Sequence, residues 1–548
     1  MREDVKVPNR ASTLAPLKHR NFRILWGATQ ASNLGGLIQA VGAGWMMTTI
    51  AESDSMVALV QAAITLPIML FSLASGALAD NFDRRLVMLT AQCLMMIASL
   101  LLVLFALQGW LTPWLLLGFT FAIGCGTALN NPSWQASVGD LVPRDDLPGA
   151  VTLNGMGFNL MRSVGPAIGG IVVAVAGAAT AFAINAASYI PFIATLLWWK
   201  PDRTPSKLPR ERFGSAVWAG LRYISMSPNL MTVLLRSLLF GCAAIAILAL
   251  LPLVASNLLN GGALTYGILL GCFGLGAIAG GFLNADVREH FSNETIVRAA
   301  CVGFAVSCLL LAASRNVWLS CFFLLPAGAC WVLALSLFNV TVQLSTPRWV
   351  VGRALSLYQT ATFGGMAAGS WLWGEIAERY DTSSSLMAAG VMLIATALVG
   401  LRLRLPEFTS LNLAPLDQFN EPQLQLDLKA RSGPIMVMID FRIAQKDVPA
   451  FLLAMADRRR IRIRDGARQW VLLRDLESPE IWTESYHVAT WIEYLRHNQR
   501  RTKADADVTE RLLALHLGPE KPRVHRMIER QTVPLQDDMP LKRNPEVP

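Results

Sequence analysis

The chain contains an internal repeat, and each copy lies between two apolar runs long enough to cross a membrane. The first copy reads GALADNFDRR at residues 76–85, and a weaker copy reads GGFLNADVRE at residues 280–289. The two copies begin 204 residues apart, and Gly374 lies the same 204 residues after Gly170. Two copies in one orientation, each holding a whole number of membrane hairpins, predict a two-fold transporter with the substrate path between the halves.

The composition excludes an ordinary soluble globule, because 53% of the 548 residues are hydrophobic and only 16% are charged. The apolar residues are concentrated before residue 405, and the remainder reads as a soluble chain. The net charge of +9 is interpreted as loop charge facing an anionic membrane surface, not as a nucleic-acid footprint. The eight cysteines show no zinc spacing, so we expect no metal site and no cofactor.

Twelve apolar stretches have about the length that a spanning helix needs, which is about 20 residues or more. Lysine and arginine gather at one set of their ends, for example at Lys18, Arg20 and Arg85, whereas the other set carries only Arg315 and Arg379. By the positive-inside rule, we expect both termini in the cytoplasm. The stretches are residues 24–50, 57–79, 86–107, 114–137, 153–176, 180–199, 231–255, 265–283, 295–313, 318–343, 354–375 and 385–403.

These stretches predict an all-α membrane bundle of twelve helices in two six-helix repeats, with a small α+β domain appended. The expected parts are a cytoplasmic N-terminus (1–22), a six-helix half (23–200), a basic central loop (201–229), a second half (230–405), a linker (406–432), a cytoplasmic domain (433–531) and a disordered tail (532–548).

The cytoplasmic domain shows the pattern of a small sandwich. Its strand and helix signals follow the order β-α-β-β-α-β, which predicts a ferredoxin-like fold. Its basic run RRRIRIR, at residues 458–464, is interpreted either as a site for anionic headgroups or an anionic ligand, or as a solvated helix end. Strands are predicted at 434–443, 468–475, 481–488 and 523–529, and helices at 447–460, 491–498 and 506–517.

The first copy of the repeat predicts a conformational latch made of Gly76, Asp80, Arg84, Arg85 and Asp140. Gly76 permits close helix approach, and Asp80 can cap a neighbouring helix in one conformation and lose that contact in another. Arg84 and Arg85 can pair with a carboxylate such as Asp140 or with lipid phosphate. The alternative is a capped turn with positive-inside charges.

At this segment the chain resembles the major facilitator superfamily, whose cytoplasmic-loop motif and twelve-helix layout it shares. The resemblance implies alternating access, with Asp80 and Arg84 in a latch between the halves. Asn81 and Asp83 depart from the basic residue and the glycine that are usual in the motif. Both residue types tolerate tight turns, so the turn is expected to survive.

The segment GPAIGG, at residues 165–170, matches the core of a motif associated with exporters of that superfamily. Gly165, Gly169 and Gly170 let helices pack backbone to backbone, and Pro166 bends the helix. Generic small-residue packing is the alternative.

A narrower resemblance, to the enterobactin-exporter-like branch, is carried by FRILW (22–26), MVALVQ (56–61), LVPRDDLP (141–148) and NLMRSVGP (159–166). It implies an ion-coupled exporter in the bacterial inner membrane that carries a siderophore, drug or metabolite, with the proton as the default coupling ion. The tail resembles the small α+β-barrel family that includes antibiotic-biosynthesis monooxygenases. Members of that family often pair through their sheets, which allows a dimer. We see no catalytic set, so we do not expect an enzyme.

The helices that line the cavity in this superfamily supply the predicted substrate site. Their amides and aromatic rings suit amphipathic cargo, although each can instead join helices. An arginine near mid-bilayer costs roughly 2.5–3.5 kcal/mol to insert, so Arg162 should face a polar interior. It either contacts an anionic substrate or braces the bundle through amides such as Asn130, while Arg236 is expected to snorkel to the interface. The predicted cavity residues are Gln30, Asn33, Asn130, Trp134, Arg162, Trp331 and Asn339.

Two other functions stay open on the sequence alone. One is an uptake carrier of the same fold, and the other is a membrane-tethered sensor or enzyme whose activity resides in the C-terminal domain. The histidines and almost all acidic residues lie outside the predicted spans, so the machinery of proton coupling is not evident. The expected partners are a small-molecule substrate, membrane lipids and a coupling proton, without nucleic acid.

Overall fold

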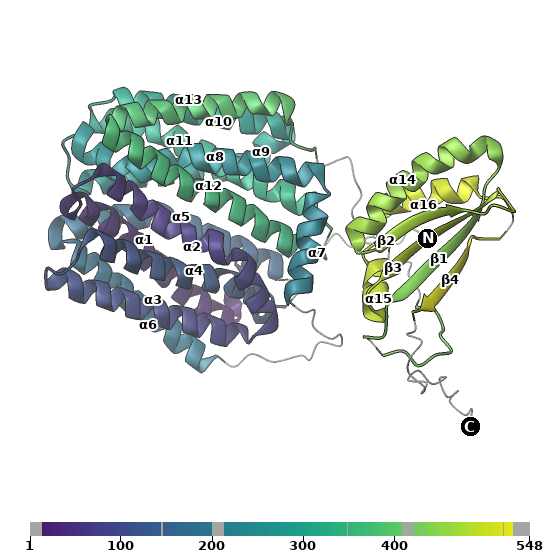
Figure 1. Cartoon of the computed structure of the whole chain (residues 1–548). Coiled ribbons are helices and arrows are strands. Elements are labelled where there is room, and N and C mark those ends of the chain that lie inside the picture. Colours follow the sequence, from purple (N-terminus) through teal and green to yellow (C-terminus); the bar gives the residue numbers. More distant parts are fainter. Residues whose placement is uncertain are drawn as a thin grey trace, which may run out of the picture. The chain divides into compact units, whose positions relative to one another are not determined.

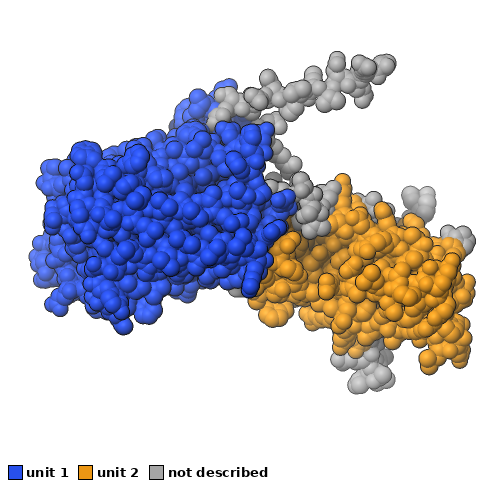
Figure 2. All heavy atoms as spheres, turned by 90° about the horizontal axis from the view of Figure 1, so that it is seen from above, with its two compact units in different colours: residues 1–211, 232–342, 355–407 blue, residues 212–231, 343–354, 408–548 orange. Residues whose placement is uncertain are grey.

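The computed structural model describes residues 14–143, 146–199, 213–347, 349–407, 416, 421–429, 431–518 and 520–529. The chain divides into two compact units, drawn in blue and orange in Figure 2. The membrane unit comprises residues 1–211, 232–342 and 355–407, and the C-terminal unit comprises residues 212–231, 343–354 and 408–548.

Within the described residues, the membrane unit is built from twelve helices of at least 21 residues each (Figure 1). Ten of them are long and apolar enough to cross a membrane. The other two, α1 and α12, carry polar residues such as Gln30, Gln39 and Thr362, which are buried in the protein. The predicted helical membrane bundle is confirmed. The helices are α1 (Arg20–Ile50), α2 (Asp54–Asn81), α3 (Arg84–Leu107), α4 (Pro113–Leu141), α5 (Leu147–Ala176), α6 (Ala178–Trp198), α8 (Pro228–Leu253), α9 (Ala263–His290), α10 (Asn293–Ala313), α11 (Val317–Leu344), α12 (Val351–Arg379) and α13 (Thr382–Arg402).

Small residues allow these helices to pack closely. In the first half α1 packs against α5 and α6, and α4 packs against α2 and α3. In the second half, a Cβ added at Gly280 of α9 would lie 2.7 Å from the Cα of Ala329 in α11. A Cβ added at Gly241 of α8 would lie 2.6 Å from the carbonyl oxygen of Thr362 in α12. Because lipid supplies no hydrophobic force between helices, such close backbone packing supplies the association energy instead.

The C-terminal unit contains a four-stranded antiparallel sheet with the strand order β2-β3-β1-β4. This order confirms the predicted ferredoxin-like fold, and the observed elements lie close to the predicted ones. The strands are β1 (Ile435–Arg442), β2 (Arg468–Arg474), β3 (Ile481–Val488) and β4 (Arg523–Ile528), and the helices are α14 (Val448–Asp465), α15 (Trp491–Gln499) and α16 (Lys503–Leu515).

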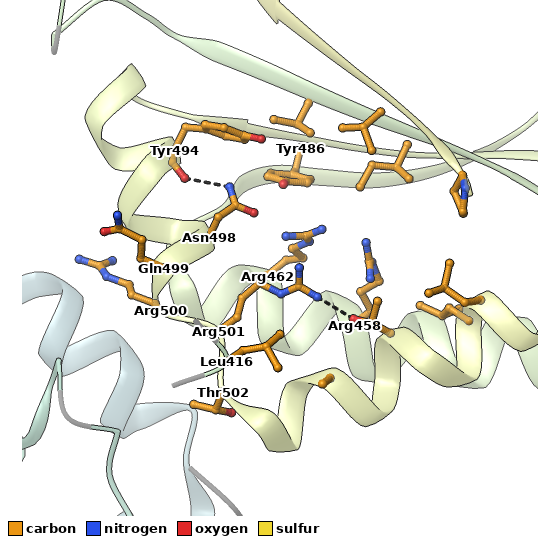
Figure 3. A pocket seen from close by; sticks show the side chains of 18 of the residues that line it. Leu416, Arg458, Arg462, Tyr486, Tyr494, Asn498, Gln499, Arg500, Arg501 and Thr502 are labelled. Atoms are coloured by element: carbon orange, nitrogen blue, oxygen red, sulfur yellow. Dashed lines mark hydrogen bonds between the residues drawn. The ribbon is translucent and has the colours of Figure 1, made fainter. Parts of the chain in front are cut away.

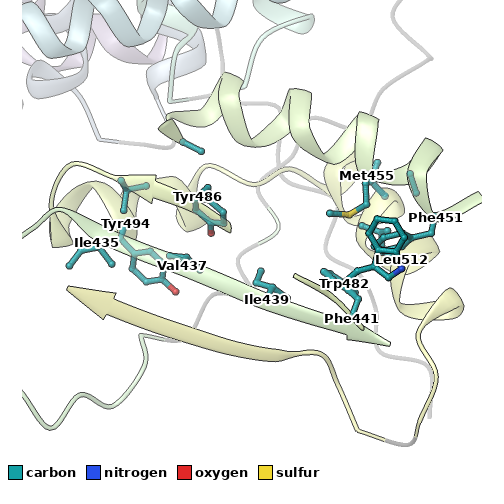
Figure 4. Packing of buried hydrophobic residues seen from close by; sticks show 14 of the residues in the cluster. Ile435, Val437, Ile439, Phe441, Phe451, Met455, Trp482, Tyr486, Tyr494 and Leu512 are labelled. Atoms are coloured by element: carbon teal, nitrogen blue, oxygen red, sulfur yellow. The ribbon is translucent and has the colours of Figure 1, made fainter. Parts of the chain in front are cut away.

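One face of this sheet carries the hydrophobic core, shown in Figure 4. Side chains alternate along a strand, so every second residue of β1 points to the helices. Phe451 and Met455 of α14 and Leu512 of α16 belong to the same buried cluster. The β1 residues of the core are Ile435, Val437, Ile439 and Phe441.

The C-terminal unit also includes a helix from the middle of the chain, α7 (Phe213–Ser225). Tyr223 of α7 packs edge-on against Trp349, with ring centroids 5.5 Å apart. The guanidinium of Arg464 lies 5.2 Å from the centroid of the Tyr223 ring. Helix α7 lies within residues 201–229, which were predicted to be a basic loop, so this helix was not predicted.

Candidate functional site

Helix α5 presents two stripes of residues to two different partners. Residues four apart lie on the same face of a helix, so Gly165 and Gly169 share one stripe. A Cβ added at Gly165 would lie 2.9 Å from the Cβ of Leu37, and one at Gly169 would lie 3.1 Å from the Cα of Ile38. This stripe joins α5 to α1 within the first half of the bundle.

The other stripe of α5, formed by Arg162, Pro166 and Gly170, faces the second half. A Cβ added at Gly170 would lie 2.7 Å from the Cα of Gly267 in α9. A Cβ added at Gly267 would lie 3.0 Å from the carbonyl oxygen of Pro166. The predicted helix-packing motif therefore contacts both halves, which its spacing alone did not reveal.

The repeat-related glycine of α12 lies at a corresponding contact. A Cβ added at Gly374 would lie 2.7 Å from the Cβ of Ala58 and 3.1 Å from the Cα of Ser55, both in α2. The backbone N–H of Ser55 donates to the Glu378 carboxylate at 3.3 Å. The α5–α9 and α12–α2 contacts each join a helix of one half to a helix of the other, and we call them the cross-half seams. In each seam the close glycine contact lies near the C-terminal end of α5 or α12.

The α12–α2 seam also contains a polar contact that the sequence did not predict. The hydroxyl groups of Ser72 and Thr360 lie 2.7 Å apart, and Ser72 donates to the carbonyl oxygen of Ser356 at 3.2 Å. Hydroxyl side chains are common in apolar helices, so these residues alone gave no signal. The repeat-related glycine was the available clue to this seam.

Arg162 and Trp331, two of the predicted cavity residues, come together from opposite halves. The Arg162 guanidinium carbon lies 5.9 Å from the centroid of the Trp331 ring. Trp331 is buried among the rings of Phe240, Phe273 and Phe304, with centroids 6.1 to 6.2 Å away. The packed aromatic cluster fixes the ring, and Arg162 is half-buried beside it. A cation near an aromatic face is an attractive pair that strengthens when water is excluded.

Two other predicted cavity residues are engaged within the first half. The Trp134 indole N–H donates to Asn154 Oδ1 at 3.1 Å. Gln92 Nε2 donates to Asn130 Oδ1 at 3.2 Å, and both of these amides are buried. Such bonds join helices, which is the alternative role expected for these side chains.

The remaining predicted cavity residues lie on α1 and α11. The Gln30 amide fits between the carbonyl oxygen of Gly157 and the indole N–H of Trp26, with both contacts at 3.2 Å when its nitrogen faces the carbonyl. Asn33 and Asn339 are half-buried. The structure thus assigns Gln30 a contact between α1 and α5.

The arginines of the predicted latch bind partners in the first half. Arg84 Nη1 donates to Asp140 Oδ2 at 2.8 Å and to a carbonyl of α4 at 2.9 Å. Arg85 donates to two carbonyls at the end of α6, at 2.6 and 2.8 Å. The surroundings of Gly76 and of the Asp80 side chain lie outside what the structure describes.

Arg236 does not snorkel to an interface, so that prediction is wrong. Its side chain is 0% exposed, and its Nη1 donates to Glu294 at 3.2 Å and to the Leu403 carbonyl at 3.0 Å. The backbone N–H of Leu405 donates to the same Glu294 carboxylate at 3.0 Å. Glu294 precedes the predicted span of α10, so its role as a buried counter-ion was not evident from the sequence.

The basic run of α14 is largely internal, so the solvated helix end expected as one alternative does not hold for three of its arginines. Arg458 and Arg462 are buried, and their Nε groups donate to the Glu484 carboxylate at 2.7 and 3.2 Å. Arg464 pairs with Asp505 at 2.9 Å. Burial opposes the ionisation of Glu484, but Arg458 and Arg462 outweigh it and lower its pKa to about 2.

Several curated transporters are similar to this chain. The staphyloferrin A transporter of Staphylococcus aureus is 25% identical over 281 residues, which cover 50% of this chain and 70% of the relative. The enterobactin exporter EntS of Escherichia coli is 25% identical over 335 residues, covering 59% and 77%. Macrolide efflux protein A of Streptococcus pyogenes is 23% identical over 397 residues, covering 70% and 96%.

Solved transporter structures share the fold of the membrane unit. The nucleoside transporter NupG matches with a TM-score of 0.56 at 11% identity, over 70% of this chain and 99% of its own. A bacterial homologue of the lysosomal transporter Spinster matches with a TM-score of 0.53 at 13% identity, over 70% and 94%. A family model described as transmembrane secretion effector matches residues 11–532, nearly the whole chain. The protein therefore belongs to the transmembrane secretion effector family of major facilitator transporters.

Proposed function

We propose that this transporter exports small amphipathic molecules, such as a siderophore, a drug or a metabolite, by alternating access driven by an ion gradient. The observation that carries the proposal is the pair of cross-half seams, α5–α9 at Gly170 and α12–α2 at Gly374. Seams made by small residues have little interdigitation, so they can part and re-form as units. Rocking one half against the other would then open one end of the bundle and close the other.

The outward direction rests on the relatives. Two of them are described as an enterobactin exporter and a macrolide efflux protein. The distribution of lysine and arginine favours cytoplasmic termini. In that orientation the glycine contacts at Gly170 and Gly374 lie toward the outer side, and cargo enters from the cytoplasmic side.

The character of the cargo rests on Arg162 and Trp331. The Arg162 guanidinium carbon lies 5.9 Å from the Trp331 ring centroid, and a half-buried cation beside an aromatic ring suits an anionic, aromatic group. An intramembrane arginine is costly to insert, which favours a functional role for it. A catecholate or carboxylate siderophore has this chemistry. The proposed roles of Gln30, Asn33 and Asn339 are secondary contacts around this pair.

The proposal is tested by cargo accumulation in inside-out vesicles energised by a proton gradient. Wild type should accumulate a labelled catecholate siderophore, and an ionophore should abolish the accumulation. Arg162→Gln should lose binding and flux of the anionic cargo, whereas Arg162→Lys should keep part of both. Arg298→Gln, which changes an exposed arginine of α10, serves as the control. Accumulation only in right-side-out vesicles would overturn the direction, and unchanged binding in Arg162→Gln would overturn the role of Arg162.

A further inference from the structure

The C-terminal unit encloses a cavity of about 1030 Å³, which lies on the side of the sheet that faces the helices. Its sheet wall is formed by Val437, Ile439 and Phe441 of β1 and by Val524 of β4. Helix α16 contributes small side chains such as Ala506 to the opposite wall, which leaves space that larger side chains would fill. Pockets that hold drug-sized molecules measure roughly 300–1,000 Å³, so this cavity has room for a small organic ligand.

The wall of this cavity is strongly basic. Figure 3 shows Arg458, Arg462 and Arg501 on the helical side of the cavity, opposite Tyr486 of the sheet. Among the described lining residues, Glu510 is the only acidic one, and its side chain is exposed. The basic lining residues are Arg458, Arg462, Arg500, Arg501, Lys521 and Arg526.

The nearby carboxylates do not balance these charges. Glu484 accepts from both Arg458 and Arg462. Asp465 and Asp505 both pair with Arg464, so three carboxylates face these three arginines and Arg501 as well. Arg501 Nη2 donates to a neutral group, the Thr509 hydroxyl, at 2.8 Å. Burial, together with the neighbouring charges of Arg462 and Arg458, lowers the pKa of Arg501 to about 10. A cluster of partly buried guanidinium groups with excess positive charge favours an oxyanion.

The basic groups are held in place before any ligand arrives. The guanidinium of Arg462 lies 4.6 Å from the centroid of the Tyr486 ring, and that of Arg458 lies 5.7 Å from the Phe441 ring. Their bonds to Glu484 fix the Nε edges, and Arg462 Nη1 also lies 3.0 Å from His497 Nε2. The remaining N–H groups are left for a ligand. Such preorganisation lowers the entropy that a ligand loses on binding.

We propose that this cavity is a binding site for a small amphipathic carboxylate that is separate from the transport path. The carboxylate head lies among Arg458, Arg462 and Arg501, and the apolar body lies along Val437 and Ile439 of β1. Trp349, in the turn that precedes α12, lines the same cavity, and the Arg500 guanidinium lies 4.2 Å from its ring. That turn leads directly into α12. A ligand that moves Trp349 would therefore act on the membrane helix through the chain itself.

The site is tested with the full-length protein in phosphatidylcholine nanodiscs, using equilibrium dialysis of labelled 2-naphthoate and its neutral analogue 2-naphthamide. Wild type should bind 2-naphthoate at least about tenfold more tightly than the amide, because each charge-assisted hydrogen bond is worth roughly that factor or more. Arg501→Gln should weaken 2-naphthoate binding by about tenfold or more and Arg501→Lys by less. Ala506→Trp should block binding without removing a charge.

Two variants separate this site from other sources of binding. Arg511→Gln removes an exposed arginine of α16 that pairs with Asp457 outside the cavity, and it should bind 2-naphthoate as wild type does. Arg162→Gln alters the transport path and should leave this binding unchanged, so failure of the proposed cargo site and failure of this site are distinguishable. Equal affinity for the acid and the amide, or unchanged binding in both Arg501→Gln and Ala506→Trp, would overturn the proposal. Loss of 2-naphthoate binding in phosphatidylglycerol nanodiscs would assign the site to a lipid headgroup instead.

Discussion

At the scale of single residues, Arg236 shows how strongly one charge depends on one partner. It is fully buried, and Glu294 is its counter-ion at 3.2 Å. Arg236→Met would leave the Glu294 carboxylate without its counter-ion, and loss of one partner of a buried pair costs about 3–5 kcal/mol. We expect a fall of that size in the free energy of unfolding, measured by denaturant titration in detergent.

The matched control for Arg236 is an ion pair at the protein surface. Arg379 pairs with Glu375 at 2.6 Å, but the Arg379 side chain is 71% exposed. Arg379→Met should change stability by no more than about 0.5 kcal/mol, because exposed pairs four residues apart contribute little. The double variant Arg236→Met, Glu294→Met should recover part of the loss. Equal losses in Arg236→Met and Arg379→Met would contradict the buried-pair argument.

Glu484 makes the stability of the C-terminal unit depend on pH in a defined direction. Its folded pKa is about 2, below the ordinary value of 4.5, so its stabilising effect is present above pH 4.5 and is lost as the pH falls toward 2. A pKa difference of that size corresponds to about 3 kcal/mol in the free energy of unfolding. Hydrogen exchange of β3 peptides, corrected for the intrinsic rate, should show this loss in wild type and lack it in Glu484→Gln. Glu480→Gln, in an exposed pair with Arg442, should behave as wild type does.

At the scale of elements, α5 allows a test of the cross-half seam with two glycines of one helix. The Cβ of Gly170→Ala would lie 2.7 Å from the Gly267 backbone, whereas that of Gly155→Ala would have no atom within 4 Å. Backbone cannot rotate away as a side chain can, so Gly170→Ala should hold α5 away from α9. We expect efflux to fall by about tenfold or more, since a clash of this kind costs about 1–3 kcal/mol, while cargo binding is kept. Equal efflux rates in the two variants would show that α5 and α9 need not close at Gly170.

Element prediction worked where the signal is local. The apolar runs predicted the twelve long helices, and residues 434–443 predicted strand β1, because both signals lie in neighbouring residues. The pairing of Gly170 with Gly267, of Ser72 with Thr360, and of Arg458 with Glu484 depends on helices and strands that are distant in sequence. The order of residue types carried no signal for those contacts. Helix α7 was missed because its surroundings are basic and its aromatic partner, Trp349, lies far along the chain.

At the scale of the whole molecule, the two units allow transport to be separated from the C-terminal domain by truncation. The end point matters, because Pro406 accepts a hydrogen bond from Asn293 at 2.8 Å and Leu405 donates to Glu294 at 3.0 Å. A chain that ends at Glu407 keeps both bonds, whereas one that ends at Gly400 loses them. We expect the first to retain at least part of the efflux in inside-out vesicles and the second to lose thermal stability. Complete loss of efflux in a stably folded chain ending at Glu407 would mean that the C-terminal domain is required for transport. That result would favour the alternative in which function resides in this domain.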